Sequence, residues 1–225
     1  MAVDLCIGVI DSGCSAQQAD SLLGARRFWL EDGVLCEGEP LPDALGHGSA
    51  VLARLRAESG GQPVLLAQVF AGQGSTSALQ VAAGLLWLVE AGATVVNLSL
   101  GLRQDRPVLR LACAEAVAAG VLLCASSPAR GEPVYPASYP GVVRVTGDAR
   151  CAAGQWSWLG TPQADFGAAV GAAGVAGASL ACAAFTGRVA ALLREEPGMT
   201  RQALLHWLEQ HAAFVGPERK ESTDA

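Results

Sequence analysis

The chain has 225 residues and a net charge of −6, from 15 basic and 21 acidic side chains. This length is enough for one large domain with a sizeable core. Hydrophobic residues make up 51% of the sequence and charged residues 16%, an apolar globular composition that excludes a disordered chain. No basic stripe is present to follow a phosphate backbone, so nucleic acid is excluded as a partner.

The cysteines predict a reducing compartment. Their number is odd and no C-x-x-C pair occurs, which favours neither a disulfide framework nor a zinc site. Several lie within apolar runs, where a free thiol behaves as a small hydrophobic side chain. We therefore expect buried, reduced and metal-free thiols. The seven cysteines are Cys6, Cys14, Cys36, Cys113, Cys124, Cys151 and Cys182.

The first residues, Met1–Ile10, contain neither a basic start nor a small-residue cleavage site, and they lead directly into a strand-like segment. The longest apolar runs are too short or too often interrupted by glycine to span a bilayer. These observations predict a cytoplasmic protein without a membrane partner.

Five apolar runs rich in β-branched residues predict buried strands, and the Ala- and Leu-rich stretches between several of them predict helices. This alternation predicts an α/β fold with three layers, in which a mostly parallel, twisted sheet carries helices on both faces. Gly92 and Gly120 follow two of the helices, where C-terminal caps are expected. The predicted strands are Leu5–Ile10, Val64–Phe70, Thr94–Leu98, Val121–Ala125 and Val142–Thr146, and the predicted helices are His47–Glu58, Ser77–Ala91 and Val108–Ala119.

The segment Cys151–Val170 has a different pattern. Polar and aromatic residues alternate strictly over Gln155–Trp158, and several turn residues surround them. This predicts an antiparallel hairpin at the rim of the sheet, with its two tryptophans packed on one face.

Two more helices are expected near the C-terminus. Ala178–Arg194 is rich in small residues, and a last helix should run from Thr200, a good N-cap, to about Ala213. No linker divides the sequence. We expect one domain over residues 1–215 and a polar, flexible tail over residues 216–225.

Three polar side chains occupy positions that suit chemistry. Asp11 directly follows a buried strand, and the carboxyl ends of strands line the functional crevice of an α/β sheet. His47 lies between Gly46 and Gly48 at the start of a helix, where glycine lets other backbone approach the ring. Ser179 lies in the first turn of an apolar helix, where its own amide and the helix dipole can stabilise an anion. Taken singly, each has a structural explanation, such as a turn or a helix cap.

Together the three suggest nucleophilic catalysis. His206 and His211 lie on the last helix and are expected to be solvated or to cap it, which leaves His47 as the candidate general base. In such a set the serine attacks a carbonyl, the histidine takes its proton, and the aspartate fixes the imidazole tautomer. We therefore assign Asp11, His47 and Ser179 as candidate catalytic residues.

The order of these motifs, and the segments between them, resemble the subtilisin-like serine proteases, or subtilases. The resemblance covers roughly Val3 to Ala213, which is nearly the whole chain. The segments that carry it, besides those around the three residues, are Ala67–Leu88, Val95–Gly101, Val134–Val142 and Asp165–Gly167.

The resemblance implies a seven-stranded, mostly parallel sheet and an endopeptidase that needs no cofactor. It also implies a peptide or protein substrate held as an added strand between two backbone edges. Ser126 and Ser127 would help to line the pocket for the residue before the scissile bond. The two edges would be Gly74, Ser75 and Thr76 on one side, and Ser99, Leu100 and Gly101 on the other.

The sequence departs from the family pattern in three ways. Ala129 stands where the family has an asparagine that donates to the oxyanion, so the backbone amide of Ser179 is the donor that the sequence assigns. Ala178 and Ala183 replace a threonine and a proline that flank the family serine. Only Ser59–Pro63 connects the histidine helix to the next strand, so the family's calcium loop is missing and we expect no metal there.

Two functions are consistent with this pattern. The first is a specialised intracellular processing or maturation protease with a weakened oxyanion hole, because slow turnover is tolerable for an enzyme with one substrate. The second is a catalytically impaired relative that binds a peptide or protein partner, which the missing oxyanion donor favours.

Overall fold

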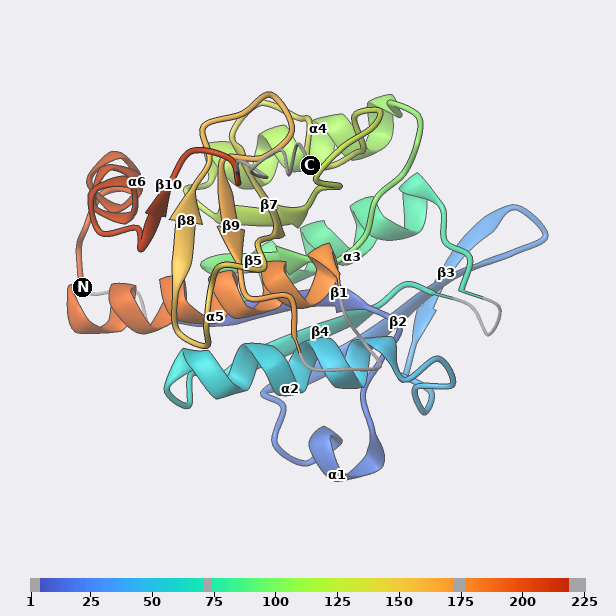
Figure 1. The fold of residues 1–225 in the computed structure, drawn as a ribbon. Coiled ribbons are helices and arrows are strands. Elements are labelled where there is room, and N and C mark those ends of the chain that lie inside the picture. The colour runs from blue at the N-terminus through green and yellow to red at the C-terminus, as the bar shows by residue number, and fades with distance from the viewer. Residues whose placement is uncertain (1–4, 71–73, 172–176, 219–225) are drawn as a thin grey trace, which may run out of the picture.

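The computed structural model describes residues 5–70, 74–171 and 177–218. Within them, ten strands form one sheet in the order β10-β8-β9-β7-β6-β5-β1-β4-β2-β3 (Figure 1). The strands are β1 (Ile7–Asp11), β2 (Gly24–Glu31), β3 (Val34–Gly38), β4 (Val64–Gln68), β5 (Val95–Leu98), β6 (Leu122–Ser126), β7 (Val142–Gly147), β8 (Trp156–Trp158), β9 (Phe166–Ala168) and β10 (Phe214–Val215). The helices are α1 (Ala16–Ala19), α2 (His47–Ser59), α3 (Ala78–Glu90), α4 (Pro107–Ala118), α5 (Ala178–Glu195) and α6 (Arg201–Gln210).

The sheet is parallel except at two hairpins. β1 lies at its centre and pairs in parallel with β4 and β5. The pairs β2–β3 and β8–β9 are antiparallel. The predicted α/β class, with a mostly parallel sheet, is confirmed.

Helices cover both faces, as predicted. On one face α2 and α5 pack against each other over Ile7, Val9 and Leu66. On the other face α3 and α4 pack over Ile10 and Val96. Alternate residues of the central strands therefore enter opposite layers of the core, which explains why these strands read as continuous apolar runs. Each helix layer is visible in Figure 1.

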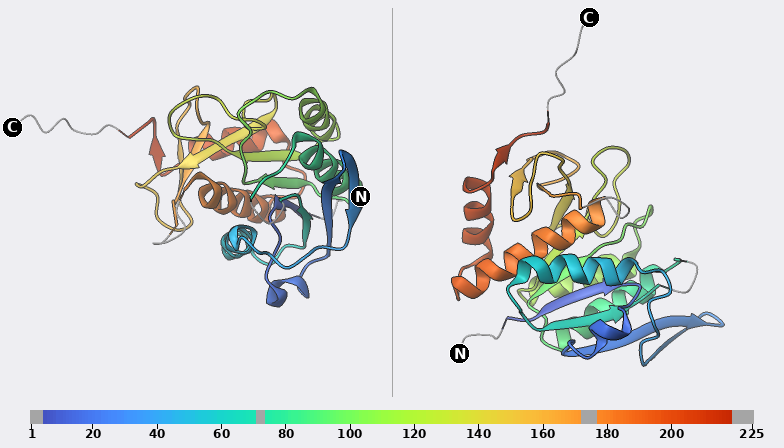
Figure 2. Two further views of the ribbon diagram at one scale, coloured as in Figure 1. Left: turned by 90° about the vertical axis from the view of Figure 1, so that its right-hand side faces the viewer. Right: turned by 60° about the horizontal axis from the view of Figure 1, so that its bottom comes forward.

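The sheet is wider than the seven strands that the resemblance implied. The outer strand β3 of the β2–β3 hairpin extends one edge, and the short strands β8 and β10 extend the other (Figure 2). The β2–β3 hairpin was not predicted, although its turn has a sequence signal. Asp32 and Gly33 both have positive φ, of 51° and 80°, which suits a two-residue Asp-Gly turn.

The predicted rim hairpin is confirmed as β8 and β9. The last helix is shorter than expected. It ends at Gln210, because the chain then turns so that β10 can pair with β8. Gly216 still donates its amide to Trp158, so the first residue of the predicted tail lies against the sheet; residues 219–225 lie outside the described residues.

Six of the seven cysteines are buried and Cys36 is half-buried, and all seven are free thiols. Burial raises the pKa of Cys113 and Cys124 to about 12, so these thiols stay protonated at neutral pH. Across the described ranges, no helix has the length and apolarity that crossing a bilayer requires.

Candidate active site

Asp11 ends the central strand β1, where the chain leaves the sheet. Its side chain is fully buried, and Oδ1 accepts a hydrogen bond of 2.7 Å from the amide of Ser12. Gln68, its partner in the neighbouring strand β4, is also buried and donates to the carbonyl oxygen of Ser12 at 2.7 Å. The strand ends thereby fix both the Asp11 backbone and the turn that follows it.

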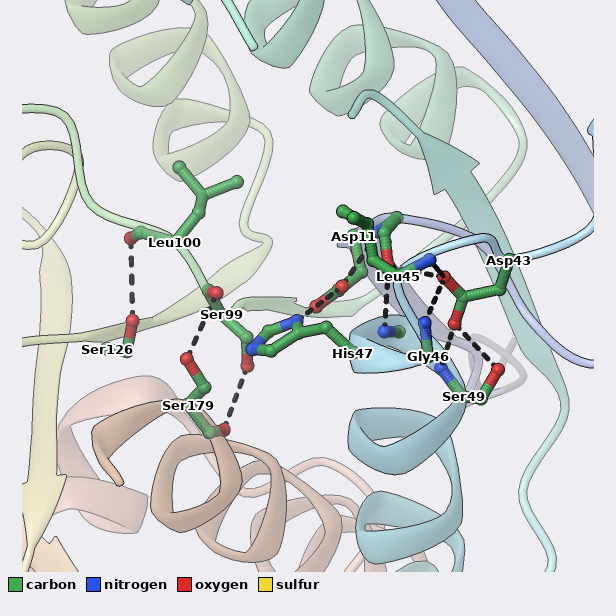
Figure 3. A network of polar contacts seen from close by, with 12 residues as sticks. Asp11, Asp43, Leu45, Gly46, His47, Ser49, Ser99, Leu100, Ser126 and Ser179 are labelled. Atoms are coloured by element: carbon green, nitrogen blue, oxygen red, sulfur yellow. Dashed lines mark hydrogen bonds and ion pairs between the residues drawn. The ribbon is translucent and has the colours of Figure 1, made fainter. Parts of the chain in front are cut away.

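His47 begins helix α2, and its ring faces Asp11 (Figure 3). Nδ1 of the ring lies 2.7 Å from Oδ1 of Asp11. A carboxylate oxygen can only accept, so Nδ1 carries the proton and Nε2 is left as the basic nitrogen. Gly48 permits this arrangement, because a Cβ there would lie 2.2 Å from the carbonyl oxygen of Gly13.

The environment of His47 favours its charged form. The hydrogen bond that His47 donates to Asp11 raises the pKa of the imidazole above its ordinary value, burial acts in the opposite direction, and the Asp11 and Asp43 charges add to the increase. The His47 side chain is 35% exposed, so it can reach a ligand in solution.

Asp43 was missed by the sequence reasoning. Its carboxylate accepts hydrogen bonds from the amides of Leu45, Gly46 and Ser49 and from the hydroxyls of Ser12 and Ser49. Burial tends to raise its pKa, but these hydrogen bonds outweigh that effect and lower it. An anion at the N-terminus of α2 stabilises the helix that carries His47. The signal was an aspartate just before a predicted helix start.

Ser179 lies in the first turn of α5 and reaches toward the end of β5. Its hydroxyl donates to the carbonyl oxygen of Ser99 at 3.2 Å, and the Ser99 hydroxyl donates to the carbonyl oxygen of Ser179 at 2.9 Å. The expected bond between Ser179 Oγ and His47 Nε2 is therefore not formed in this rotamer. Figure 3 shows the His47 ring between the Asp11 carboxylate and the Ser99–Ser179 pair.

A buried polar chain behind Ser99 was also missed. Thr186 on α5 donates to Asn97 Oδ1 at 3.1 Å, and Asn97 Nδ2 donates to the Ser99 hydroxyl at 2.9 Å. Thr186 and Asn97 are fully buried and Ser99 is 3% exposed. Helix α5 is thus bonded to the end of β5 both at Ser179 and at Thr186, and these contacts fix the position of the first turn of the helix. No periodic pattern identifies such pairs, because their partners are distant in the sequence.

A small cavity of about 260 Å³ lies beside His47. It brings together Gly74 and Ser99, one residue from each predicted substrate edge, and Leu45 and Phe70 form its apolar walls. The cavity gives the imidazole an open side toward a ligand.

The other predicted substrate residues are not among the described residues that line this cavity. Leu100 is buried, and its carbonyl oxygen accepts from the Ser126 hydroxyl at 3.4 Å. Gly101 is exposed, and a Cβ there would lie 3.1 Å from Val134. Ser75 and Thr76 line a second, larger cavity that shares Leu45 and Phe70 with the first.

The loop that carries Ala129 contributes no side-chain donor at that position, because alanine has none and the residue is exposed. The Ser127 hydroxyl is engaged elsewhere and donates to the carbonyl oxygen of Gln163 at 2.6 Å. Gln163 in turn donates to the carbonyl oxygen of Gly131 at 2.7 Å, which closes the loop against its neighbour. The amide of Ser179 lies in the first turn of α5, where amides have no partner within the helix.

In the three described stretches, no cluster of three or more His, Cys, Asp or Glu side chains is arranged to hold a metal ion. The arrangement is instead that of an acid–base pair beside a helix-start serine. Fold and geometry together agree with the resemblance to the subtilisin-like proteins.

Comparison with known proteins confirms the resemblance. No protein-family model matches the chain. The intracellular serine protease of Paenibacillus polymyxa is 28% identical over 160 residues, which are 62% of this chain and 48% of that protein. The major intracellular serine protease of Bacillus subtilis (strain 168) is similar to the same extent, at 27% identity. The chain thus spans about half the length of these curated relatives.

Solved structures confirm the fold. A cold-adapted subtilisin-like serine proteinase superposes with a TM-score of 0.69 over 99% of this chain and 85% of that one, at 21% identity. A lanthipeptide protease superposes with a TM-score of 0.68 over 90% of this chain and 78% of that one, at 17% identity. The three-layer fold is that of the subtilisin-like proteins, and the sequence matches subtilisin-family serine proteases.

Proposed function

We propose that this protein is a serine endopeptidase in which Asp11, His47 and Ser179 form the catalytic triad. The observation that carries the proposal is the 2.7 Å contact between Asp11 Oδ1 and His47 Nδ1, which leaves Nε2 basic and open to the cavity beside the ring. Ser179 adjoins the same cavity through Ser99, which lines it and bonds Ser179 in both directions.

The chemistry follows from these positions. Rotation about the Cα–Cβ bond takes the Ser179 hydroxyl from the Ser99 carbonyl toward Nε2 of His47. Nε2 accepts the proton as Oγ attacks the carbonyl carbon of the scissile peptide bond, and Asp11 stabilises the imidazolium. His47 then returns the proton to the leaving amine. A water molecule, activated by the same nitrogen, hydrolyses the acyl-enzyme and restores the Ser179 hydroxyl.

The tetrahedral intermediate needs donors for its oxyanion. The backbone amide of Ser179 and the positive end of the α5 dipole can stabilise the oxyanion from one side. Ala129 supplies no side-chain donor, and the Ser127 hydroxyl is bonded to Gln163. Loss of one such donor typically lowers turnover by about 10²–10³-fold. We therefore propose slow hydrolysis.

Slow turnover suits a specialised role. We propose that the protein processes one peptide or protein substrate inside the cell, bound as an extended strand between the Gly74–Thr76 and Ser99–Gly101 edges. The intracellular proteases among its relatives, and its structural similarity to a lanthipeptide protease, support this assignment. A cytoplasmic location agrees with the seven free thiols.

A second candidate is a peptide-binding protein with little or no catalysis. The observation that favours it is the Ser179 hydroxyl, which is turned to Ser99 O and away from the imidazole. In this case the same cleft would hold an extended peptide without cleaving it.

Hydrolysis of short chromogenic peptides by the parent, Ser179→Ala and His47→Ala separates the two. The matched control is Ser138→Ala, an exposed serine whose loss should leave turnover unchanged. If the parent and Ser138→Ala turn over and the other two do not, the endopeptidase proposal stands. Equal rates of hydrolysis in all four proteins would contradict the endopeptidase proposal.

A further inference from the structure

A second cavity, of about 490 Å³, adjoins the one beside His47. Strand β2, the segment that leads to α2, and the residues before α3 enclose it. The two cavities share Ser12, Leu45 and Phe70. A Cβ on Gly74, which lines the cavity beside His47, would lie 3.7 Å from Cδ1 of Leu45, one of the side chains common to both cavities.

The larger cavity has an apolar wall that is open to solvent. Leu30, Leu41 and Leu45 contribute to it and are 39%, 55% and 41% exposed. Two polar residues of the lining, Gln68 and Gln80, are already engaged, because their amide groups bond to surrounding backbone. The wall is therefore suited to the aliphatic part of a side chain.

Arg27 is the one charged residue among the described residues that line this cavity. Its guanidinium carbon lies 4.0 Å from the centre of the Trp29 ring, so the group stacks on the indole. Within residues 5–70, 74–171 and 177–218 no carboxylate lies within 4.0 Å of it, and its buried Nε has no hydrogen-bond partner. The buried hydroxyl of Thr76, which also lines the cavity, lacks a partner among the same residues.

A guanidinium held flat on an aromatic ring, with its donors uncommitted, is suited to a carboxylate. The Thr76 hydroxyl adds a further donor at the same wall. The net charge of the chain is −6, so the Arg27 guanidinium is not part of a general basic surface. The site therefore combines a binder of one carboxylate with an apolar wall.

We propose that this cavity, the Arg27 pocket, binds an acidic side chain of the peptide substrate, while the apolar side chain of the adjacent residue enters the cavity beside His47. The proposal rests on the proposed function, since Ser75 and Thr76 line the pocket and also belong to the predicted substrate edge. The acidic residue is therefore adjacent, in the substrate sequence, to the residue whose side chain enters the cavity beside His47. Arg27 acts here as a specificity residue and takes no part in the chemistry.

A titration of the full-length Ser179→Ala chain with an end-blocked Glu-Phe dipeptide tests this pocket directly. The readout is the indole N–H resonance of Trp29, assigned with Trp29→Phe among the five tryptophans. We expect a saturable shift, and binding about tenfold weaker for the Gln-Phe dipeptide, as for the loss of one charge-assisted contact. A Glu-Ala dipeptide should also bind more weakly.

Two variants make the result specific. Arg27→Gln should abolish the difference between Glu-Phe and Gln-Phe, and Arg27→Glu should prefer Lys-Phe. An unmoved Trp29 resonance, or equal affinities for Glu-Phe and Gln-Phe in the parent, overturns the proposal. Because this assay reads binding alone, failure of catalysis leaves it unaffected. If hydrolysis is found and the titration fails, only the Arg27 pocket is lost.

Discussion

Ser99 and Ser179 hold each other through two reciprocal hydrogen bonds. Each hydroxyl donates to the other residue's carbonyl oxygen, at 2.9 Å from Ser99 and 3.2 Å from Ser179. The pair joins the end of β5 to the first turn of α5, so the backbone at Ser179 is fixed while its hydroxyl can still change rotamer. The proposed nucleophile is thus positioned by a residue that the sequence assigned to substrate binding.

We expect Ser99→Ala to weaken both stability and reactivity. The substitution removes the bond to the Ser179 carbonyl and leaves buried Asn97 Nδ2 without its acceptor. An unpaired buried donor costs about 1–3 kcal/mol, which chemical denaturation can measure. Peptide hydrolysis should fall in parallel. Ser138→Ala is the control, and a Ser99→Ala protein with parental stability and rate would contradict the positioning role.

The pH dependence of the proposed reaction follows from His47. Its pKa lies above its ordinary value of 6.5, and the base must be neutral to accept the Ser179 proton. Activity should therefore rise with pH through a midpoint above about 6.5 and be lost below it. Asp11→Asn removes the first cause of the shift and should lower the midpoint, with turnover about 10⁴-fold lower, as in serine protease triads.

The contribution of His47 to stability should change with pH in the opposite direction and decrease as pH rises. A histidine whose pKa is raised by folding contributes stability that is present below the unfolded pKa and is lost as pH rises through the folded pKa. His47→Gln should therefore destabilise the chain more at pH 5 than at pH 9. Thermal unfolding of both proteins across this range measures the difference, and a constant difference would mean that the Asp11–His47 contact adds no linked stability.

Gly48→Ala tests the close approach of Gly48 to the turn at Gly13, next to the Asp11–His47 pair. A Cβ would lie 2.2 Å from the carbonyl oxygen of Gly13 and 3.1 Å from Asp11 Oδ1, so the turn and the helix must separate. Overpacking of this kind costs about 1–3 kcal/mol. Ala57→Ser, at an exposed position of the same helix, should cost little. A Gly48→Ala chain as stable and as active as the parent would show that the turn yields freely.

The sequence was most informative where function depends on local pattern. Asp11 at a strand end and His47 between glycines could be paired in advance, because with Ser179 they follow the chain order of the subtilisin-like motifs. The rotamer of Ser179 could not be predicted, since it depends on a hydrogen bond to Ser99, which is 80 residues away in the sequence. The hairpin β2–β3 had a readable Asp32-Gly33 turn, but its half-exposed strands lack the long apolar runs of the core strands. Without that hairpin the Arg27 pocket could not be foreseen.

Ala129→Asn should supply an oxyanion donor that, on the proposed function, the parent lacks. Ala129 is exposed in a loop that Gln163 holds closed, so an amide side chain there does not have to enter the core. Recovery of up to about 10²-fold in turnover is expected, by the effect of one donor. Ala129→Leu is a size-matched control that cannot donate. Equal turnover in Ala129→Asn and Ala129→Leu would show that this position is remote from the oxyanion.

Covalent labelling by a fluorophosphonate probe tests the central claim most directly, because the probe reacts with an activated serine whether or not a good peptide substrate is known. The parent should incorporate one probe, located on Ser179 by peptide mass spectrometry, and His47→Ala and Ser179→Ala should incorporate none. Labelling should follow the same rise with pH as hydrolysis. A parent that stays unlabelled, or that is labelled equally when His47 is removed, would contradict the triad and leave the peptide-binding function.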